Sequence, residues 1–146
     1  MKIILTFLIV ILSASSFNVF AKDSLTIHIE DIDDSVLRYK NLKSLTLTFE
    51  KNLHSEIEYI PEVVFKLKSL KTLKIRAYFP YGRIKAIPKE IGNLTNLETL
   101  SITGNSSINK LPKEITNLKK LKSLDLDGNG INDTKSLSRK TRSPTS

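Results

Sequence analysis

The chain has 146 residues, a formal net charge of +8 and a hydrophobic fraction of 40%, so it is long enough to bury one domain core. It contains no cysteine, which excludes disulfides and a lipoprotein anchor. Its two histidines, His28 and His54, lie far apart, and neither a phosphate-binding glycine loop nor an HExxH motif is present. We therefore expect no enzyme activity, no cofactor and no metal site.

Residues 1–21 have the pattern of a secretory signal peptide. A nearly continuous apolar run extends from Ile3 to Leu12, and Val19 and Ala21 occupy the positions where a signal peptidase requires small residues. The run is shorter than the roughly 20 residues that a membrane span needs. The sequence therefore predicts a secreted or periplasmic protein without a membrane anchor, and an uncleaved anchor reaching Phe20 is the alternative.

Residues 22–41 form the next predicted unit. Leu25, Ile27 and Ile29 alternate with polar residues as in a half-buried strand, and an acidic cluster follows at residues 30–34. The first unit of a stacked array has a neighbour on one side only, so its outer side must be polar. We expect a divergent N-terminal cap or first repeat here, with Asp34 or Ser35 capping its helical turn.

Two kinds of apolar block then alternate. Blocks with the strand-like spacing LxxLxL begin at Leu42, Leu70, Leu97 and Leu121. Blocks with apolar residues three, six and nine positions after a proline, the spacing of a short helical or 3₁₀ turn, begin at Pro61, Pro88 and Pro112. Their regular alternation predicts a coil of strand and short helix, with repeats at 42–69, 70–96 and 97–120 and an incomplete one at 121–135.

This pattern resembles the leucine-rich repeat family, whose 20–29-residue unit reads LxxLxLxxN. The motifs LPKEI at 111–115 and IPKEI at 87–91 are most similar to the bacterial and plant-type units. The resemblance implies an α/β fold, a short right-handed horseshoe fragment with a parallel concave sheet and a convex side of 3₁₀ or short helices. Animal extracellular members usually have disulfide-bonded caps, so the lack of cysteine favours a bacterial secreted protein.

The asparagine of the family pattern is present in one half of the chain only. Asn105 and Asn129 occupy its position in the last two repeats, whereas Glu50 and Tyr78 stand there in the two longer repeats. In the family, this side chain is buried and bonds the backbones of neighbouring loops. We expect the first half to be held instead by apolar residues packed inward, for which the candidates are Phe49, Leu53 and Phe79.

The C-terminal residues carry two weaker patterns. Residues 136–146 have the composition of a disordered basic tail, which we interpret as a solvated end, and we expect no nucleic-acid binding. The segment DLDGNG at 125–130 begins like an EF-hand calcium loop, but its twelfth position, where glutamate is required, is Ser136. We therefore assign Leu126 to the core and Asn129 to the asparagine position.

Two surfaces are candidates for binding. Strand residues between the core leucines point to the concave face, where hydroxyls, a basic pair and an acidic pair follow one another. These residues are Thr46, Thr48, Thr72, Lys74, Arg76, Thr99, Ser101, Thr103, Asp125 and Asp127. The second surface is the loop after Arg76, rich in the aromatic and arginine residues that dominate interfaces, namely Tyr78, Phe79, Tyr81 and Arg83.

The leading hypothesis is a monomeric binding module that recognises another protein, as the family resemblance implies. The summed positive charge favours an acidic partner. The alternative is a truncated or structural repeat protein with no specific partner.

Overall fold

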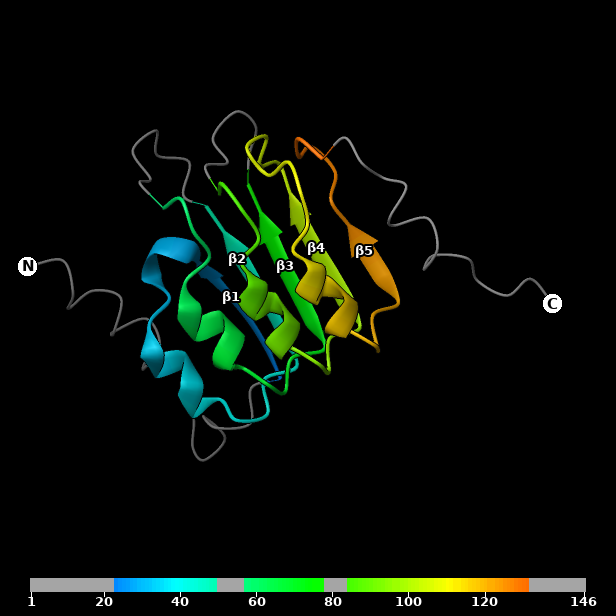
Figure 1. Ribbon diagram of the computed structural model, residues 1–146. Coiled ribbons are helices and arrows are strands. Elements are labelled where there is room, and N and C mark those ends of the chain that lie inside the picture. Colours follow the sequence, from blue (N-terminus) through cyan, green and yellow to red (C-terminus); the bar gives the residue numbers. More distant parts are fainter. Residues whose placement is uncertain (1–22, 50–56, 78–83, 132–146) are drawn as a thin grey trace, which may run out of the picture.

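The computed structural model describes residues 23–49, 57–77 and 84–131 (Figure 1). In these ranges, strands alternate with short 3₁₀ helices along the chain. The strands are β1 (Ser24–His28), β2 (Ser44–Thr48), β3 (Thr72–Arg76), β4 (Thr99–Thr103) and β5 (Ser123–Asp125). The 3₁₀ helices are η1 (Ile29–Asp31), η2 (Asp34–Arg38), η3 (Glu62–Lys66), η4 (Lys89–Asn93) and η5 (Lys113–Asn117).

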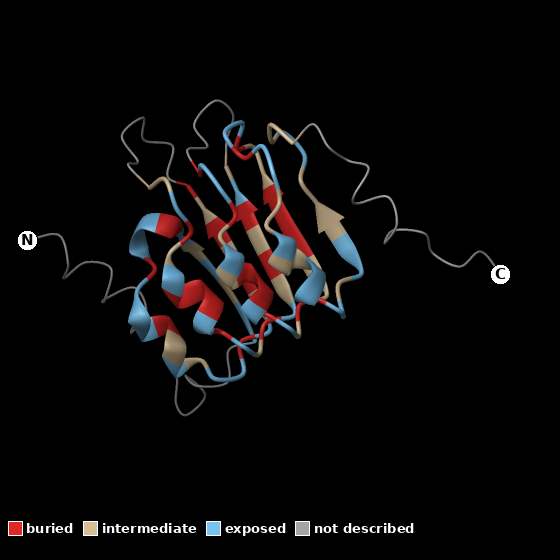
Figure 2. Cartoon of the chain, viewed as in Figure 1, coloured by how far each residue is buried: buried red, intermediate tan, exposed pale blue. Residues whose placement is uncertain are grey.

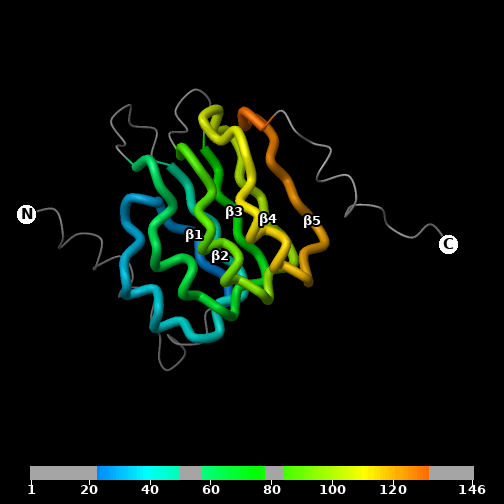
Figure 3. Tube along the Cα trace, viewed as in Figure 1, coloured from blue at the N-terminus to red at the C-terminus, as the bar shows by residue number. Residues whose placement is uncertain are grey.

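All five described strands pair in parallel and in sequence order, β1-β2-β3-β4-β5. The pairing puts Leu45, Leu73, Leu100 and Leu124 side by side. Each turn of the chain therefore advances the sheet by one strand, and the turns stack as Figures 1 and 3 show. This open parallel sheet, with a 3₁₀ helix on the way to each following strand, confirms the predicted fold class.

The prolines define where three of the 3₁₀ helices begin. Pro61, Pro88 and Pro112 are the residues before the first turn, where the missing N–H of proline costs nothing. The leucine after each helix closes it, for example by the Leu94 N–H donating to the carbonyl of Ile91 at 3.1 Å. The apolar series after each proline thus forms one tight turn whose buried side faces the sheet.

Helix η2 has no proline, and its cap differs from the prediction. The side chain of Asp33 accepts a hydrogen bond from the backbone N–H of Ser35 at 2.8 Å. The prediction of Asp34 or Ser35 as the cap was therefore wrong, because the helix begins at Asp34 and the capping side chain belongs to the residue before it.

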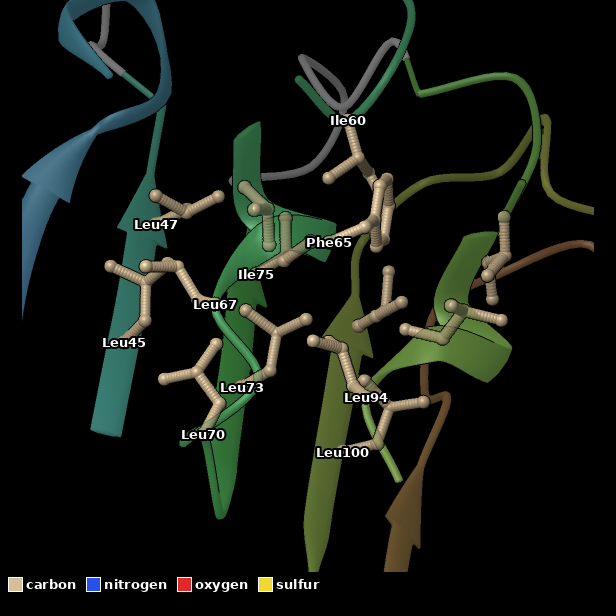
Figure 4. Packing of buried hydrophobic residues seen from close by; sticks show 14 of the residues in the cluster. Leu45, Leu47, Ile60, Phe65, Leu67, Leu70, Leu73, Ile75, Leu94 and Leu100 are labelled. Atoms are coloured by element: carbon tan, nitrogen blue, oxygen red, sulfur yellow. The ribbon is translucent and has the colours of Figure 1, made fainter. Parts of the chain in front are cut away.

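The core lies between the sheet and the 3₁₀ helices (Figure 2). Leucine and isoleucine side chains from the strands meet those from the helices, and Figure 4 shows Leu73 and Leu100 among them. In the last described turn, Leu121, Leu124 and Leu126 are half-buried rather than buried. The apolar residues of this turn lack the complete cover that a following turn gives to the interior ones.

Two side chains hold the loops of the C-terminal half together. The fully buried Asn105 accepts a hydrogen bond from the Ile84 N–H through Oδ1 at 3.2 Å and donates one from Nδ2 to the Thr103 carbonyl at 3.0 Å. Asn129 Oδ1 in turn accepts a hydrogen bond from the Asn105 N–H at 3.1 Å, and its Nδ2 donates to the carbonyl of Leu126 at 2.6 Å. The asparagine ladder is therefore present where the sequence placed it.

The described part of the N-terminal half buries two phenylalanine side chains instead. Phe49 is 3% exposed and belongs to the core, as predicted. Phe65 in η3 is also buried, and it stands at the position that Gly92 occupies in η4. A Cβ atom on Gly92 would lie 2.9 Å from the Cβ of Glu114 in η5, so the glycine permits a close approach of η4 and η5. Leu53 and Phe79, the other residues predicted to pack inward, lie outside the described residues.

Candidate interaction surface

The sheet has one face turned away from the 3₁₀ helices, and we call it the open face. It carries every second residue of each strand, because side chains alternate along a strand. One row across it contains Thr26, Thr46, Lys74, Ser101 and Asp125, which the register places side by side. The parallel register therefore converts equivalent repeat positions into rows of neighbouring side chains.

Strand β3 supplies the positive charge of the open face. Lys74 is half-buried and Arg76 is exposed, and hydroxyl residues flank both of them on β2 and β4. Lys74 has Thr46 and Ser101 as neighbours, whereas Arg76 has Thr48 and Thr103. Within residues 23–49, 57–77 and 84–131, neither cation forms an ion pair. The face thus combines cationic and hydroxyl donors along its middle.

Strand β5 ends the face with the carboxylate of Asp125, which already has hydrogen-bond partners. Asp125 Oδ2 accepts a hydrogen bond from the Ser101 hydroxyl at 2.9 Å, and Oδ1 accepts one from the Asp127 N–H at 3.1 Å. Ser101 is 7% exposed, so its hydroxyl is bonded to Asp125 and is hardly accessible to a partner. In the described residues no group of three or more potential ligands is placed to hold a metal ion.

Strand β1 extends the open face beyond the residues selected from the sequence. Its polar residues Ser24, Thr26 and His28 are exposed and continue the rows of β2. His28 Nδ1 lies 3.2 Å from the Thr48 hydroxyl. In the register, Thr48 lies between His28 on β1 and Arg76 on β3. The alternation of Leu25 and Ile27 already carried this signal, since it puts the intervening residues on the side opposite the core.

The second predicted surface falls mostly outside the described residues. Arg76 ends β3 and is exposed. Tyr78, Phe79, Tyr81 and Arg83 lie in the segment 78–83, which the structure does not describe.

For the described ranges, no helix has the length and apolar character that crossing a bilayer requires.

The stacked turns define the chain as a solenoid, a protein class in which each repeat contacts its sequence neighbours. The family model described as "Leucine-rich repeat region" matches residues 16–139. The chain therefore belongs to the leucine-rich repeat family, as its motifs predicted. Among curated proteins, no sequence matches it.

Solved structures give the same fold. The leucine-rich repeat protein LIC12759 of Leptospira interrogans is 27% identical with a TM-score of 0.60, and the match covers 75% of this chain and 26% of that one. The leucine-rich repeat domain of the type III effector XopL is 22% identical with a TM-score of 0.58, covering 75% and 38%. This chain therefore spans well under half of either relative, and the XopL likeness concerns the fold alone.

A third similar structure was determined with a bound partner. It is the ectodomain of the Arabidopsis thaliana receptor kinase GASSHO1/SCHENGEN3 in complex with CASPARIAN STRIP INTEGRITY FACTOR 2. It is 25% identical with a TM-score of 0.50, and the match covers 73% of this chain and 12% of that one. Leucine-rich repeat modules are typically interaction modules rather than enzymes, and the fold of this chain fits that role.

Proposed function

We propose that this protein binds another protein through the open face of its sheet. The observation that carries the proposal is the charge order across that face, with the cations of β3 between hydroxyl-bearing strands and the carboxylate of Asp125 on β5. Oppositely charged surfaces speed association and select among partners. A partner with an acidic region over β3 matches this order, and the ectodomain from Arabidopsis offers a precedent for partner binding in the family.

The test uses charge reversal on two sides of the molecule. The purified chain, immobilised as bait, should capture a specific partner from extracellular or periplasmic fluid. The variant Lys74→Glu with Arg76→Glu should then weaken binding of that partner by about tenfold or more. The matched control, Lys89→Glu with Lys113→Glu, makes the same change of net charge on the helical side and should bind like the wild type.

Two results would contradict the proposal. If both variants lose affinity equally, net charge rather than the open face governs binding. If the wild-type chain captures no specific partner, the alternative of a structural repeat protein becomes the better account. Melting temperatures of both variants must match that of the wild type, so that unfolding is not mistaken for lost contact.

The segment 78–83, which follows β3 in the sequence, is the second place where the partner can bind. Tyr81 and Arg83 have the side-chain types that carry most interface energy. Replacing both by alanine should weaken binding by about 2 kcal/mol if the loop contributes, with little change in melting temperature. Normal binding by this double variant would leave the open face as the sole candidate.

We further propose that residues 1–21 direct export, which makes the protein secreted or periplasmic, and that the exported chain is a monomer of bacterial origin. The support is the short apolar run before Ala21 and the LPKEI-type units. Mass spectrometry of the exported protein should find Lys22 as its first residue. An intact Met1 in the exported protein would instead indicate an uncleaved anchor.

A further inference from the structure

The fold gathers positive charge along one rim of the solenoid. Each turn passes from a 3₁₀ helix into the next strand through a six-residue segment, and these segments are residues 38–43, 66–71, 93–98 and 117–122. They form the rim at the lower end of the strands in Figure 1, where Figure 2 shows many exposed residues. Together with Asp23, which precedes β1, we call this rim the basic edge.

The basic edge has a different charge from the rest of the described residues. It contains nine cationic side chains and two carboxylates, Asp23 and Glu98, which gives a formal charge of +7. The other described residues contain six cationic side chains and ten carboxylates, a formal charge of −4. The cations of the edge are Arg38, Lys40, Lys43, Lys66, Lys68, Lys71, Lys119, Lys120 and Lys122.

The stacking of the turns explains why these charges lie close together and how the repulsion between them is reduced. Equivalent residues of neighbouring turns lie about 4.8 Å apart, the spacing of paired strands. The turn at 93–98 has no cation and supplies acceptors instead. Glu98 binds the Nζ atoms of Lys71 and Lys122 at 3.1 and 2.6 Å, and Asn96 Oδ1 accepts from Lys120 Nζ at 2.7 Å.

These contacts leave the edge open to an external anion. The side chains of Lys43, Lys71 and Lys122 are 54%, 55% and 75% exposed although each has a carboxylate partner. Ion pairs at such exposure are weak and exchange partners readily. Asp34, which lies outside the edge, is also 3.5 Å from the Nζ of Lys66. These three carboxylates offset only part of the nine cations, so the edge keeps a positive field.

We infer that the basic edge adsorbs to the phosphate headgroups of an anionic lipid surface. Eight of its nine cations are lysines, which act as flexible point charges and do not form the bidentate pairs that arginine makes with a specific partner. Clusters of four to eight basic residues near a surface are typical of anionic-lipid binding, with contributions that add for each charge. Because the edge is a rim of the sheet, adsorption there leaves the open face accessible.

The test measures co-sedimentation of the full chain with two kinds of vesicle, phosphatidylcholine alone and phosphatidylcholine mixed with phosphatidylglycerol. Binding to the mixed vesicles in excess of binding to phosphatidylcholine reports the electrostatic part. The triple variant Lys40→Gln, Lys68→Gln, Lys119→Gln should lower that excess affinity by roughly 10- to 100-fold. Added salt should lower it for the wild type as well.

A matched control separates the edge from overall charge. The triple variant Lys89→Gln, Lys110→Gln, Lys113→Gln removes the same charge from exposed lysines elsewhere and should keep nearly the wild-type affinity. Equal losses in both triple variants, or no loss in the edge variant, would overturn the inference. It would also be overturned if the chain bound soluble heparin through the edge but showed no excess binding to the anionic vesicles. The result does not depend on the open face, so it is independent of the proposed protein partner.

Discussion

The two halves of this solenoid close the same coil by different physical means. Around β2 and β3, the repeats are long, Phe49 and Phe65 are buried, and the asparagine of the family pattern is missing. Around β4 and β5, Asn105 and Asn129 bond adjacent loops, and Gly92 permits close packing of η4 on η5. The strand and helix register is therefore the constant of this fold, whereas the side chains buried beside it differ, with phenylalanines in the described part of one half and hydrogen-bonded asparagines in the other.

The largest loss of stability is expected from a substitution in the strand core, because both halves depend on the same strand register. Leu100 is fully buried between Leu73 and Leu124 of the neighbouring strands. Leu100→Asp should unfold the domain, since it buries an unpaired charge. Leu100→Ala should lower the free energy of unfolding by about 2–5 kcal/mol. Urea denaturation followed by circular dichroism checks both, and an unchanged midpoint would contradict the register.

In the N-terminal half, the buried ring of Phe49 should make a large contribution to stability. Phe49→Ala removes a buried aromatic ring and should cost about 3–5 kcal/mol, whereas Phe49→Leu, which keeps most of the apolar volume, should cost much less. The same urea titration measures the difference. If the two variants are equally stable, the loops of this half are held by something other than the volume of Phe49.

In the C-terminal half, a polar side chain should take that role. Asn105→Ala leaves the Ile84 N–H and the Thr103 carbonyl without their partner and should cost about 1–3 kcal/mol. Combined with Asn129→Ala, it should be non-additive because the two residues are hydrogen-bonded. Combined with Phe49→Leu, it should be additive. If the stability losses of Asn105→Ala and Asn129→Ala simply add in the double variant, the two asparagines do not act as a unit.

The amino-acid sequence alone indicated part of this difference between the two halves. The ladder positions of Asn105 and Asn129 followed from the family resemblance, because both residues match the asparagine of the pattern LxxLxLxxN. For the first half, the sequence offered Phe49, Leu53 and Phe79 as alternatives, and packing identified Phe49 among the described residues. On the candidate site, the sequence placed Lys74 and Arg76 on one face but did not reveal that Ser101 is buried against Asp125.

The smallest effect should come from the basic edge, which runs past both halves. Hydrogen bonds from Lys122 and Lys71 lower the pKa of Glu98 from 4.5 to about 2. A carboxylate whose pKa is lowered by folding stabilises the native state above its unfolded pKa, and this contribution is lost as the pH falls through the folded pKa. Stability should therefore decline between about pH 4.5 and pH 2.

The variant Glu98→Gln isolates this contribution, because the amide cannot titrate. Its melting temperature should depend less on pH than that of the wild type in the same window, and high salt should reduce the difference. Identical pH profiles for the two proteins would mean that the exposed lysines do not favour the charged form of Glu98 in solution.

By itself, the sequence determined the repeat and the short helical or 3₁₀ turns after each proline, because the spacing of apolar residues decides which face of a strand or turn is buried. The parallel strands and the asparagine ladder followed from its resemblance to the leucine-rich repeat family. The tertiary structure decided that Phe49 is buried, that Asp33 rather than its neighbours caps η2, and that the excess positive charge of the described residues lies on one rim. These depend on stacking, which brings residues 20 to 28 positions apart in the chain to the spacing of neighbouring strands.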